Sequence, residues 1–208
     1  MPDSIDGTPL ARVPLVAHPS APCPAVREVT ASLALDGASL VLICRIAGDL
    51  NGLRIPAAGE DLDPLRLWAH TCAEIFVAPA GAEAYVEHNF SPCGRAARFA
   101  FAAYRERTDA AAFDGTVVVS RHDGAVEIEG RVPRGDLGAA EARLSLSAVI
   151  EDAQGELSLW AVRHPCQRPD FHHRGGLALT WSATPVPAIA VDEDIPLAQG
   201  ATPRGDPR

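Results

Sequence analysis

Apolar and polar residues alternate along most of the chain between residues 27 and 184. In the segment REVTASLALDG, every second residue is apolar (Val29, Ala31, Leu33 and Leu35), and an Asp-Gly pair follows. A period of two places the apolar side chains on one face of a strand, and Asp-Gly is a common hairpin turn. The pattern therefore predicts a strand that ends in a tight turn.

Five further segments have the same character and are closed by turn residues. They are SLVLICRIAGD (39–49), FDGTVVVSRHDG (113–124), AVEIEGRVP (125–133), RLSLSAVIEDAQG (143–155) and ELSLWAVRHP (156–165). Short strands at this spacing, with hardly any 3.6-residue periodicity, are typical of an all-β sandwich or barrel. The helical candidates are limited to residues 133–143 and a turn near Asp63 and Pro64.

Both ends of the chain lack this alternation. The first 26 residues contain six prolines, which predicts an extended lead-in. Residues 185–208 mix proline, glycine and acids, which predicts a disordered tail whose deletion would leave the melting temperature unchanged. No internal repeat is visible, so we predict one domain over residues 27–184.

The charge of the chain excludes several kinds of chemistry. Its 208 residues carry a formal net charge of −9, and all 18 basic residues are arginine. Without lysine the chain cannot form a lysine Schiff base or a P-loop. Nucleic acid is an unsuitable partner for an acidic chain without a basic stripe, because affinity depends on neutralising phosphates.

The sequence also indicates in which cellular compartment the protein is expected. The N-terminus carries acids and prolines where a signal peptide needs positive charge and an apolar run, and no segment reaches the roughly 20 apolar residues of a membrane span. The cysteines are Cys23, Cys44, Cys72, Cys93 and Cys166, an odd number without a CxxC pair. We expect free thiols, no thiolate zinc site, no membrane partner and a cytoplasmic location. The oligomeric state stays open.

The segment LWAHTCAEIFVAPAGAEAYVEHNFSPCG (67–94) holds two strand-like runs around a small-residue turn, which predicts an antiparallel hairpin. If both runs are extended, the side chains that share a face are Trp68, His70, Cys72, Glu74 and Phe76 on the first strand and Tyr85, Glu87 and Asn89 on the second. Glu74 and Glu87 then lie side by side.

Two neighbouring carboxylates are compatible with several roles. They could act as the acid and base of a glycoside hydrolase, hold a hard cation such as calcium, or accept hydrogen bonds from sugar hydroxyls beside Trp68 or Tyr85. Solvated or arginine-paired residues on an exposed sheet face would show the same spacing.

The same hairpin resembles a known family. The pattern W-x-x-T-C-x-E-x-F, then Y-x-E-x-N-x-S-P, is similar to the core of DOMON-like proteins related to the type 9 carbohydrate-binding modules, and more narrowly to their bacterial stand-alone members. The matching residues are Trp68, Thr71, Cys72, Glu74, Phe76, Tyr85, Glu87, Asn89, Ser91 and Pro92. Further matches are LVAHP (15–19), LRIP (53–56) and LWAVRHPCQRPDFHH (159–173). The resemblance implies an immunoglobulin-like or jelly-roll sandwich of antiparallel strands that binds a ligand and catalyses nothing. In related families the ligand is a sugar or a haem.

The segment WAVRHPCQRPDFHH contains further polar candidates, among them Arg163 and His164. Adjacent histidines on an extended chain point to opposite sides and two prolines interrupt the segment, so the spacing is poor for a metal. We expect a loop that reaches over the sheet, where Arg163 pairs with a carboxylate of the protein or of a ligand. Glu74, Glu87 and Asn89 should then converge with Arg163 on one site.

Haem fits the chain poorly, because its only methionine is Met1 and lysine is absent, so two histidines would have to serve as axial ligands. No cofactor is therefore expected. Three hypotheses stay open: a saccharide-binding module, a hydrolase that uses Glu74 and Glu87, and a structural or protein-interaction domain without a small ligand. The expected ligand-binding residues are Trp68, Glu74, Tyr85, Glu87, Asn89, Arg163 and His164.

Overall fold

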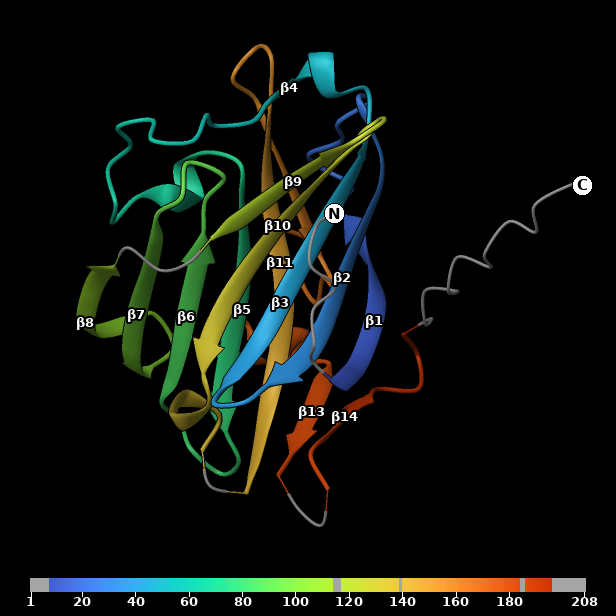
Figure 1. The fold of residues 1–208 in the computed structure, drawn as a ribbon. Helices are drawn as coiled ribbons and strands as arrows, with labels where there is room; N and C mark the ends of the chain where they lie inside the picture. Colours follow the sequence, from blue (N-terminus) through green and yellow to red (C-terminus); the bar gives the residue numbers. More distant parts are fainter. Residues whose placement is uncertain (1–7, 114–116, 139, 184–185, 196–208) are drawn as a thin grey trace, which may run out of the picture.

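The computed structural model describes residues 8–113, 117–138, 140–183 and 186–195, which form a β-sandwich (Figure 1). The strands are β1 (Thr8–Ala17), β2 (Val26–Asp36), β3 (Ser39–Gly48), β4 (Leu53–Arg54), β5 (Cys72–Pro79), β6 (Tyr85–Phe90), β7 (Ala96–Ala103), β8 (Glu106–Phe113), β9 (Val118–His122), β10 (Ala125–Pro133), β11 (Glu141–Asp152), β12 (Leu157–Ala161), β13 (Leu179–Ser182) and β14 (Ala188–Val191). The helices of the described residues are short 3-10 turns: η1 (Leu50–Gly52), η2 (Leu67–Ala69), η3 (Arg134–Leu137) and η4 (Arg174–Gly176). The all-β prediction is confirmed.

The strands form two antiparallel layers. The first sheet has the order β1-β2-β3-β10-β9, and the second has the order β8-β7-β6-β5-β11-β12. Strand β1 joins the layers, because residues 8–15 pair with β2 while Val16 and Ala17 pair with β12. Strands β13 and β14 extend the second sheet next to β11, and β4 pairs with the far end of β11.

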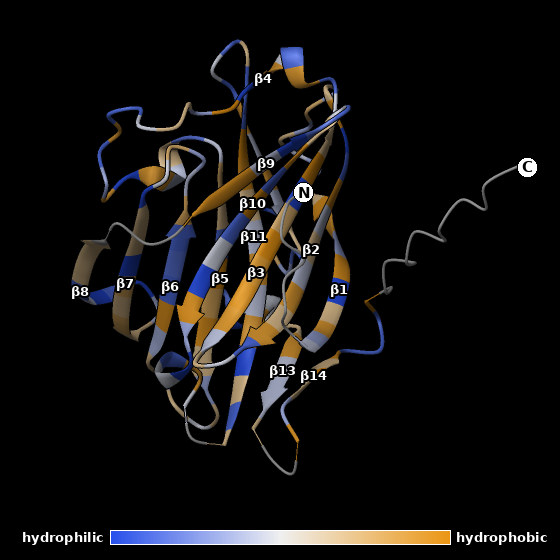
Figure 2. Ribbon diagram, in the orientation of Figure 1, coloured by the Kyte–Doolittle hydropathy of each residue, from blue (hydrophilic) through white to orange (hydrophobic). Residues whose placement is uncertain are grey.

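The alternation seen in the sequence decides which side chains enter the space between the sheets. Val29, Ala31 and Leu33 of the first sheet and Ile75 and Val77 of the second belong to one buried apolar cluster. Figure 2 shows the hydrophobic colouring along β3, whose neighbours β2 and β10 cover both of its edges. Burial of this apolar surface is the main source of stability in such a sandwich.

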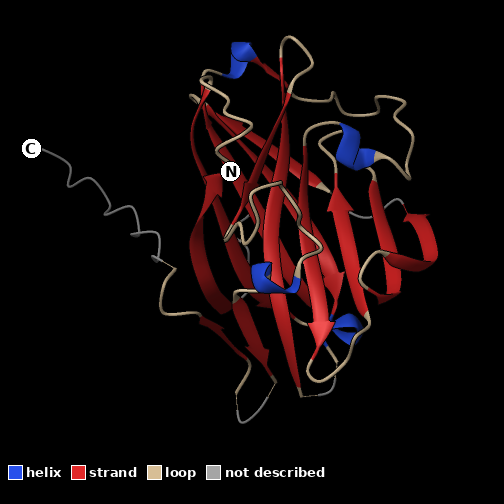
Figure 3. Ribbon diagram, turned by 180° about the vertical axis from the view of Figure 1, so that it is seen from behind, coloured by secondary structure: helices blue, strands red, loops and turns tan. Residues whose placement is uncertain are grey.

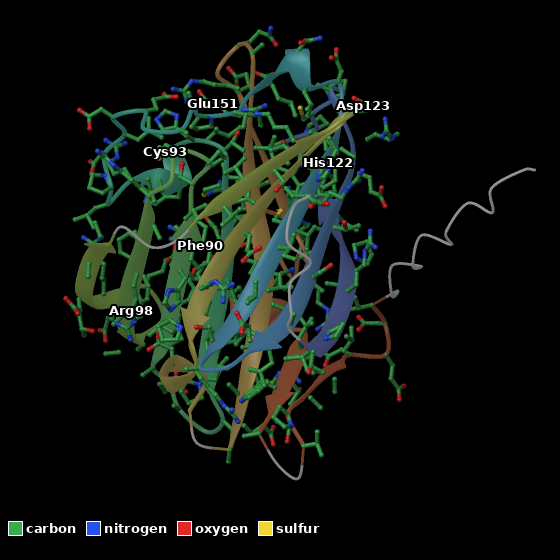
Figure 4. All side chains as sticks on the ribbon, in the orientation of Figure 1. Phe90, Cys93, Arg98, His122, Asp123 and Glu151 are labelled. Carbon is green, nitrogen blue, oxygen red and sulfur yellow. The ribbon has the colours of Figure 1, made fainter. Side chains whose placement is uncertain are left out.

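At one point between the two sheets, a glycine faces an aromatic ring. A Cβ atom added to Gly130 on β10 would lie 2.2 Å from a ring carbon of Phe90 on β6. Phe90, labelled in Figure 4, is completely packed, with 1% of its surface exposed. Only glycine leaves room for this ring between the layers.

One inward-facing polar residue has its partner at the edge of the sandwich. His88 on β6 is fully buried, and its Nε2 atom lies 2.8 Å from a carboxylate oxygen of Asp136 in η3. Arg98 (Figure 4) donates two hydrogen bonds to the same carboxylate. Because its Nε2 atom has this carboxylate as a partner, the burial of His88 has a structural explanation that needs no ligand.

Three expectations about local structure need correction. Residues 8–17 of the expected lead-in form β1, whose two prolines are tolerated because this part of the strand pairs on one side, with β2. Residues 186–195 of the expected tail include β14, while 196–208 lie outside the described residues. The helix expected over residues 133–143 is limited to η3, because Gly138 adopts a φ of 75° and β11 begins at Glu141.

None of the helices in the described part of the chain has the length and apolar character that a membrane crossing requires.

Candidate ligand-binding site

The predicted hairpin forms, and it carries polar side chains on the outer face of the second sheet. Strands β5 and β6 are antiparallel, with Glu74 opposite Asn89 and Phe76 opposite Glu87. Cys72 shares the outer face with Glu74, since its thiol donates to a carboxylate oxygen at 3.5 Å. The prediction that Glu74 and Glu87 lie on one face of neighbouring strands is confirmed.

The expected strand from Trp68 onward is wrong at its beginning. Residues 67–69 form the 3-10 turn η2, and β5 starts at Cys72. Trp68 therefore stands above the sheet with 46% of its surface exposed. The indole still reaches the same site, because it lines the pocket described next.

A pocket of about 770 Å³ lies over this outer face. Figure 3, the view from behind, shows loops crossing the strands of the second sheet on this side. The pocket lining comes from β5 to β8, β11, β12 and the loops: Trp68, Glu74, Phe76, Glu87, Phe99, Phe101, Arg105, Arg107, Val149, Leu157, Leu159, Pro169, Phe171 and His172. Its walls are thus largely aromatic and aliphatic, with charged groups confined to a few positions.

Glu74 and Glu87 are almost completely buried in this pocket, with 2% and 6% of their surfaces exposed. Glu74 accepts hydrogen bonds from the Ser147 hydroxyl at 3.0 Å and from the Cys72 thiol. Glu87 accepts one from the Asn89 amide nitrogen at 2.9 Å. Within the described part of the chain, no arginine forms an ion pair with either carboxylate.

Burial without a paired cation favours the protonated forms of both groups. Burial, together with the nearby charge of Glu87, raises the pKa of Glu74 from 4.5 to about 8. Burial raises the pKa of Glu87 to about 7, although the hydrogen bond from Asn89 and the charges of Arg105 and Arg107 oppose the change. Near neutral pH the two carboxyls therefore hold protons that exposed glutamates would lack.

A histidine from the loop after β12 closes one side of the site. His172 Nε2 lies 3.8 Å from Glu87, and its Nδ1 lies 2.8 Å from the Tyr85 hydroxyl. That hydroxyl accepts the backbone N–H of Arg105, so its own proton is free to point at Nδ1. Burial and the charge of Arg105 lower the pKa of His172 to about 4. The imidazole is therefore neutral near pH 7, with its Nε2 atom turned toward Glu87.

The two rim arginines differ in their partners. Arg105 donates to Asp170 at 2.8 Å, and Tyr104 donates to the other oxygen of the same carboxylate. Arg107 lies over the ring of Phe99, with the guanidinium carbon 5.7 Å from the ring centroid. The charge of Arg105 is thus neutralised by the protein, while Arg107 projects over an aromatic wall of the pocket.

Tyr85 and Asn89 support the site from beneath its lining. The Tyr85 ring stacks on Phe101 with centroids 4.6 Å apart, and 7% of the residue is exposed. Asn89 is fully buried, and its Oδ1 atom has no hydrogen-bond partner among the described residues. Both residues belong to the predicted set, but they orient the lining residues rather than form the wall.

The expectation that Arg163 joins the carboxylates is wrong. Its guanidinium donates to Asp192 at 3.2 Å and also pairs with Asp194, both beyond β14. His164 lies nearby, with Nε2 2.9 Å from the Val16 carbonyl oxygen, and it lines a different hollow. Neither residue contacts the pocket that contains Glu74 and Glu87.

The geometry of the histidine-rich segment does not support a metal-binding site. Among the described residues, no group of three or more histidine, cysteine, aspartate or glutamate side chains is arranged to hold a metal ion. His173 caps η4 by accepting a hydrogen bond from the backbone N–H of Gly175. Of the two adjacent histidines, His172 is therefore the one that lines the pocket.

A second polar cluster flanks the site beneath Trp68. Arg54 on β4 donates to Glu151 at 2.9 Å and pairs with Glu60, and His70 Nδ1 lies 2.8 Å from Glu151. Figure 4 labels Glu151 at the end of the molecule that carries β4. These contacts fix the segment between β4 and β5, and with it the position of Trp68.

Comparisons with known proteins give one informative similarity. No family model matches the chain, and no curated protein matches it. Among solved structures, a "putative carbohydrate-binding protein" from Bacteroides uniformis ATCC 8492 aligns with a TM-score of 0.63 and 19% identity, over 88% of this chain and 87% of that one. The two proteins share a fold.

A family 9 carbohydrate-binding module from Caldicellulosiruptor kristjanssonii, solved in complex with cellotriose, is more distant. Its TM-score is 0.39 and its identity 10%, over 69% of this chain and 73% of that one. This similarity is too low for residues of the two sites to be compared.

Proposed function

We propose that this protein is a non-catalytic binding domain that holds a saccharide, or a similarly hydroxyl-rich small molecule, in the pocket on the outer face of the second sheet. The observation that supports this proposal most directly is that one cavity combines an exposed Trp68, a wall of phenylalanines and two buried carboxyls. Pockets of roughly 300–1,000 Å³ with apolar walls and few polar groups are typical of small-molecule sites. The Bacteroides uniformis protein that shares this fold is described as carbohydrate-binding, which supports the same assignment.

Within this proposal, the domain is a DOMON-like relative of the type 9 carbohydrate-binding modules, as the hairpin pattern around Glu74 and Glu87 suggests. We also propose a reducing, cytoplasmic location, which the five free cysteines support.

The hydrolase alternative has one supporting observation, which is that both carboxyls line a cavity and have raised pKa values. Glycoside hydrolysis needs one carboxyl as an acid and the other as a base or nucleophile. Raised pKa values follow from burial of the two carboxyls, so by themselves they do not indicate a catalytic acid and base. The solved structure that shares the fold is described as carbohydrate-binding, which favours binding. Binding without catalysis is the better account.

A purely structural domain would pair its buried carboxylates with a protein cation. Arg163, the residue expected to do so, instead pairs with Asp192 and Asp194. The carboxyls of the pocket are therefore left for another partner.

A glycan array followed by calorimetric titration of the best ligand tests the proposal. Trp68→Ala and Glu87→Gln should each weaken binding by about tenfold or more, since each removes a stacking surface or a charged hydrogen-bond acceptor. Val118→Ala on β9 is the matched control, because Val118 is similarly exposed, at 49%, and lies on the other sheet.

The same titrations distinguish the alternatives. Equal affinity of Trp68→Ala and the unaltered protein would contradict the pocket assignment. If the unaltered protein released product from aryl glycosides and the Glu74→Gln variant did not, the hydrolase hypothesis would be favoured instead.

A further inference from the structure

The carboxyl end of the pocket has more hydrogen-bond acceptors than donors. Glu74 and Glu87 offer four oxygens to the pocket, and behind the lining the buried Asn89 Oδ1 has no partner among the described residues. The close protein donors are the Ser147 hydroxyl, the Cys72 thiol and the Asn89 amide. A ligand that binds here should therefore bring N–H or O–H donors.

The walls beside the carboxyls suit a positive charge. Aromatic faces attract cations, and the rings of Phe76, Phe99 and Phe101 all line the pocket. The protein already uses one of these faces in this way, since the guanidinium of Arg107 lies over Phe99. A second cation, supplied by the ligand, would meet both rings and carboxyls.

The protein's own cations lie at the other end. Glu87 on β6 is opposite Phe99, and Arg107 on β8 is opposite Phe101 of β7. Arg107 is therefore two strands from Glu87 and three from Glu74, roughly 10 Å and 14 Å at the usual spacing of neighbouring strands. Arg105 is held by Asp170. The pocket thus has its two carboxyls over β5 and β6 and its arginines at the β8 end.

We propose that Glu74 and Glu87 form a subsite for a cationic amino group, so that the preferred ligand is an amine-bearing saccharide rather than a neutral one. This inference rests on the proposed saccharide-binding function and specifies its ligand. A neutral hydroxyl can donate a single proton to a carboxylate and leaves the buried charge uncompensated. An ammonium group supplies three donors and the compensating charge.

Binding of an ammonium group should release protons, because a cation between the carboxyls stabilises their ionised forms. Both carboxyls have raised pKa values in the free protein. The titratable and charged groups that face or influence the pair are Cys72, Tyr85, Arg105, Arg107, Asp170 and His172. Of these, Cys72 has a pKa well above its usual range through burial and the nearby Glu74, so it stays protonated.

The test compares two trisaccharides with the same sugar backbone: the β-1,4-linked glucosamine trimer, whose amines are charged, and its N-acetylated form, whose larger amide groups are neutral. Calorimetry at about pH 6.5 keeps the amines charged, since amines beside electron-withdrawing groups titrate near 7.7–8.0. The amine trimer should bind about tenfold or more tightly than the acetylated one. Titrations in phosphate and in Tris, which differ in ionisation enthalpy, should show net proton release.

Glu87→Gln is the first variant, because a glutamine oxygen can still accept from Asn89. It should reduce the preference for the amine trimer severalfold, and Glu74→Gln should do the same. Glu83→Gln in the β5–β6 hairpin loop, a glutamate whose side chain is 81% exposed, should leave the preference unchanged. Thermal unfolding of each variant shows whether the fold is intact.

Equal affinity for the two trimers without proton release would overturn the ammonium subsite and leave the saccharide proposal standing. Absence of binding by both trimers and by the whole glycan array would overturn the saccharide proposal, and the inference with it. A preference for the amine trimer that survives in both Gln variants would also overturn the assignment to Glu74 and Glu87.

Discussion

Replacing Glu74 by glutamine should flatten the pH dependence of stability above neutrality. The folded protein holds a proton on Glu74 up to about pH 8, whereas the unfolded chain releases it near the ordinary value of 4.5. A group whose folded pKa is raised contributes stability at low pH that is lost as pH rises toward the folded pKa. The free energy of unfolding should therefore fall with rising pH, by about 1.4 kcal/mol per unit for each such proton.

The useful window lies between about pH 6.5 and pH 8. Below it, His172 acts with the opposite sign, because its folded pKa is lowered to about 4 and protonation favours the unfolded chain. Across the window Glu74 should cost about 2 kcal/mol, and Glu87, with its pKa of about 7, should add about 1 kcal/mol. Both carboxyls are nearly inaccessible to solvent, so screening by water reduces these values little.

Urea unfolding at several pH values in this window measures the effect. The unaltered protein should lose about 2 kcal/mol more than Glu74→Gln over the window. Glu83→Gln serves as the control, because its exposed side chain lies in the loop of the same hairpin. Parallel profiles for the unaltered protein and Glu74→Gln would refute the conclusion that Glu74 is protonated in the folded state.

Three further changes should have separable effects on stability and binding. Deletion of residues 184–208 removes β14 and should lower the melting temperature by roughly 2–4 °C for each 1 kcal/mol of stability lost, and an unchanged value would contradict the pairing of β14 with β13. Gly130→Ala forces a Cβ into an aromatic ring and should cost about 1–3 kcal/mol in urea unfolding, whereas Gly135→Ala, with open space around it, should cost under about 1 kcal/mol. Arg163→Ala should lower stability by about 1–2 kcal/mol in urea unfolding and leave ligand affinity intact, because its partners Asp192 and Asp194 lie away from the pocket.

The sequence predicts the hairpin at the centre of the site well, because its signal is local. Alternation with a period of two assigns Glu74 and Glu87 to one face and Ile75 to the other, and a short loop determines that the strands are antiparallel. Both properties depend on residues within about 20 positions of each other. The structure has the pairing that they imply.

The rest of the site depends on strands with weaker sequence signals. Strand β7 reads AARFAFAA, and its many alanines have little strand preference. Phe99 and Phe101 nevertheless share a face by their spacing of two. That spacing was the available signal for the aromatic wall, whereas Arg105 lies in a turn with a φ of 58°, where alternation gives no signal.

The ion-pair partners of Arg163 could not be predicted from the sequence, for a different reason. The sequence supplies a cation and several possible carboxylates, but charge alone does not select among them. Its actual partners, Asp192 and Asp194, follow a strand so short and so rich in alanine that the segment resembles a tail. An ion pair between distant segments becomes predictable only after the strands that carry it have been placed.

The buried carboxyl pair is difficult to explain as a feature selected for stability alone. Whole domains are stable by about 5–15 kcal/mol, and burying two carboxyls without a partner cation, even in protonated form, costs part of that. Apolar residues at the positions of Glu74 and Glu87 would extend the aromatic cluster of Phe76, Phe99 and Phe101 on the same face. Residues that oppose the folding of their own sheet are expected where binding requires them. The cost thus supports a site whose ligand supplies the missing charge, which is the property that the two trisaccharides measure.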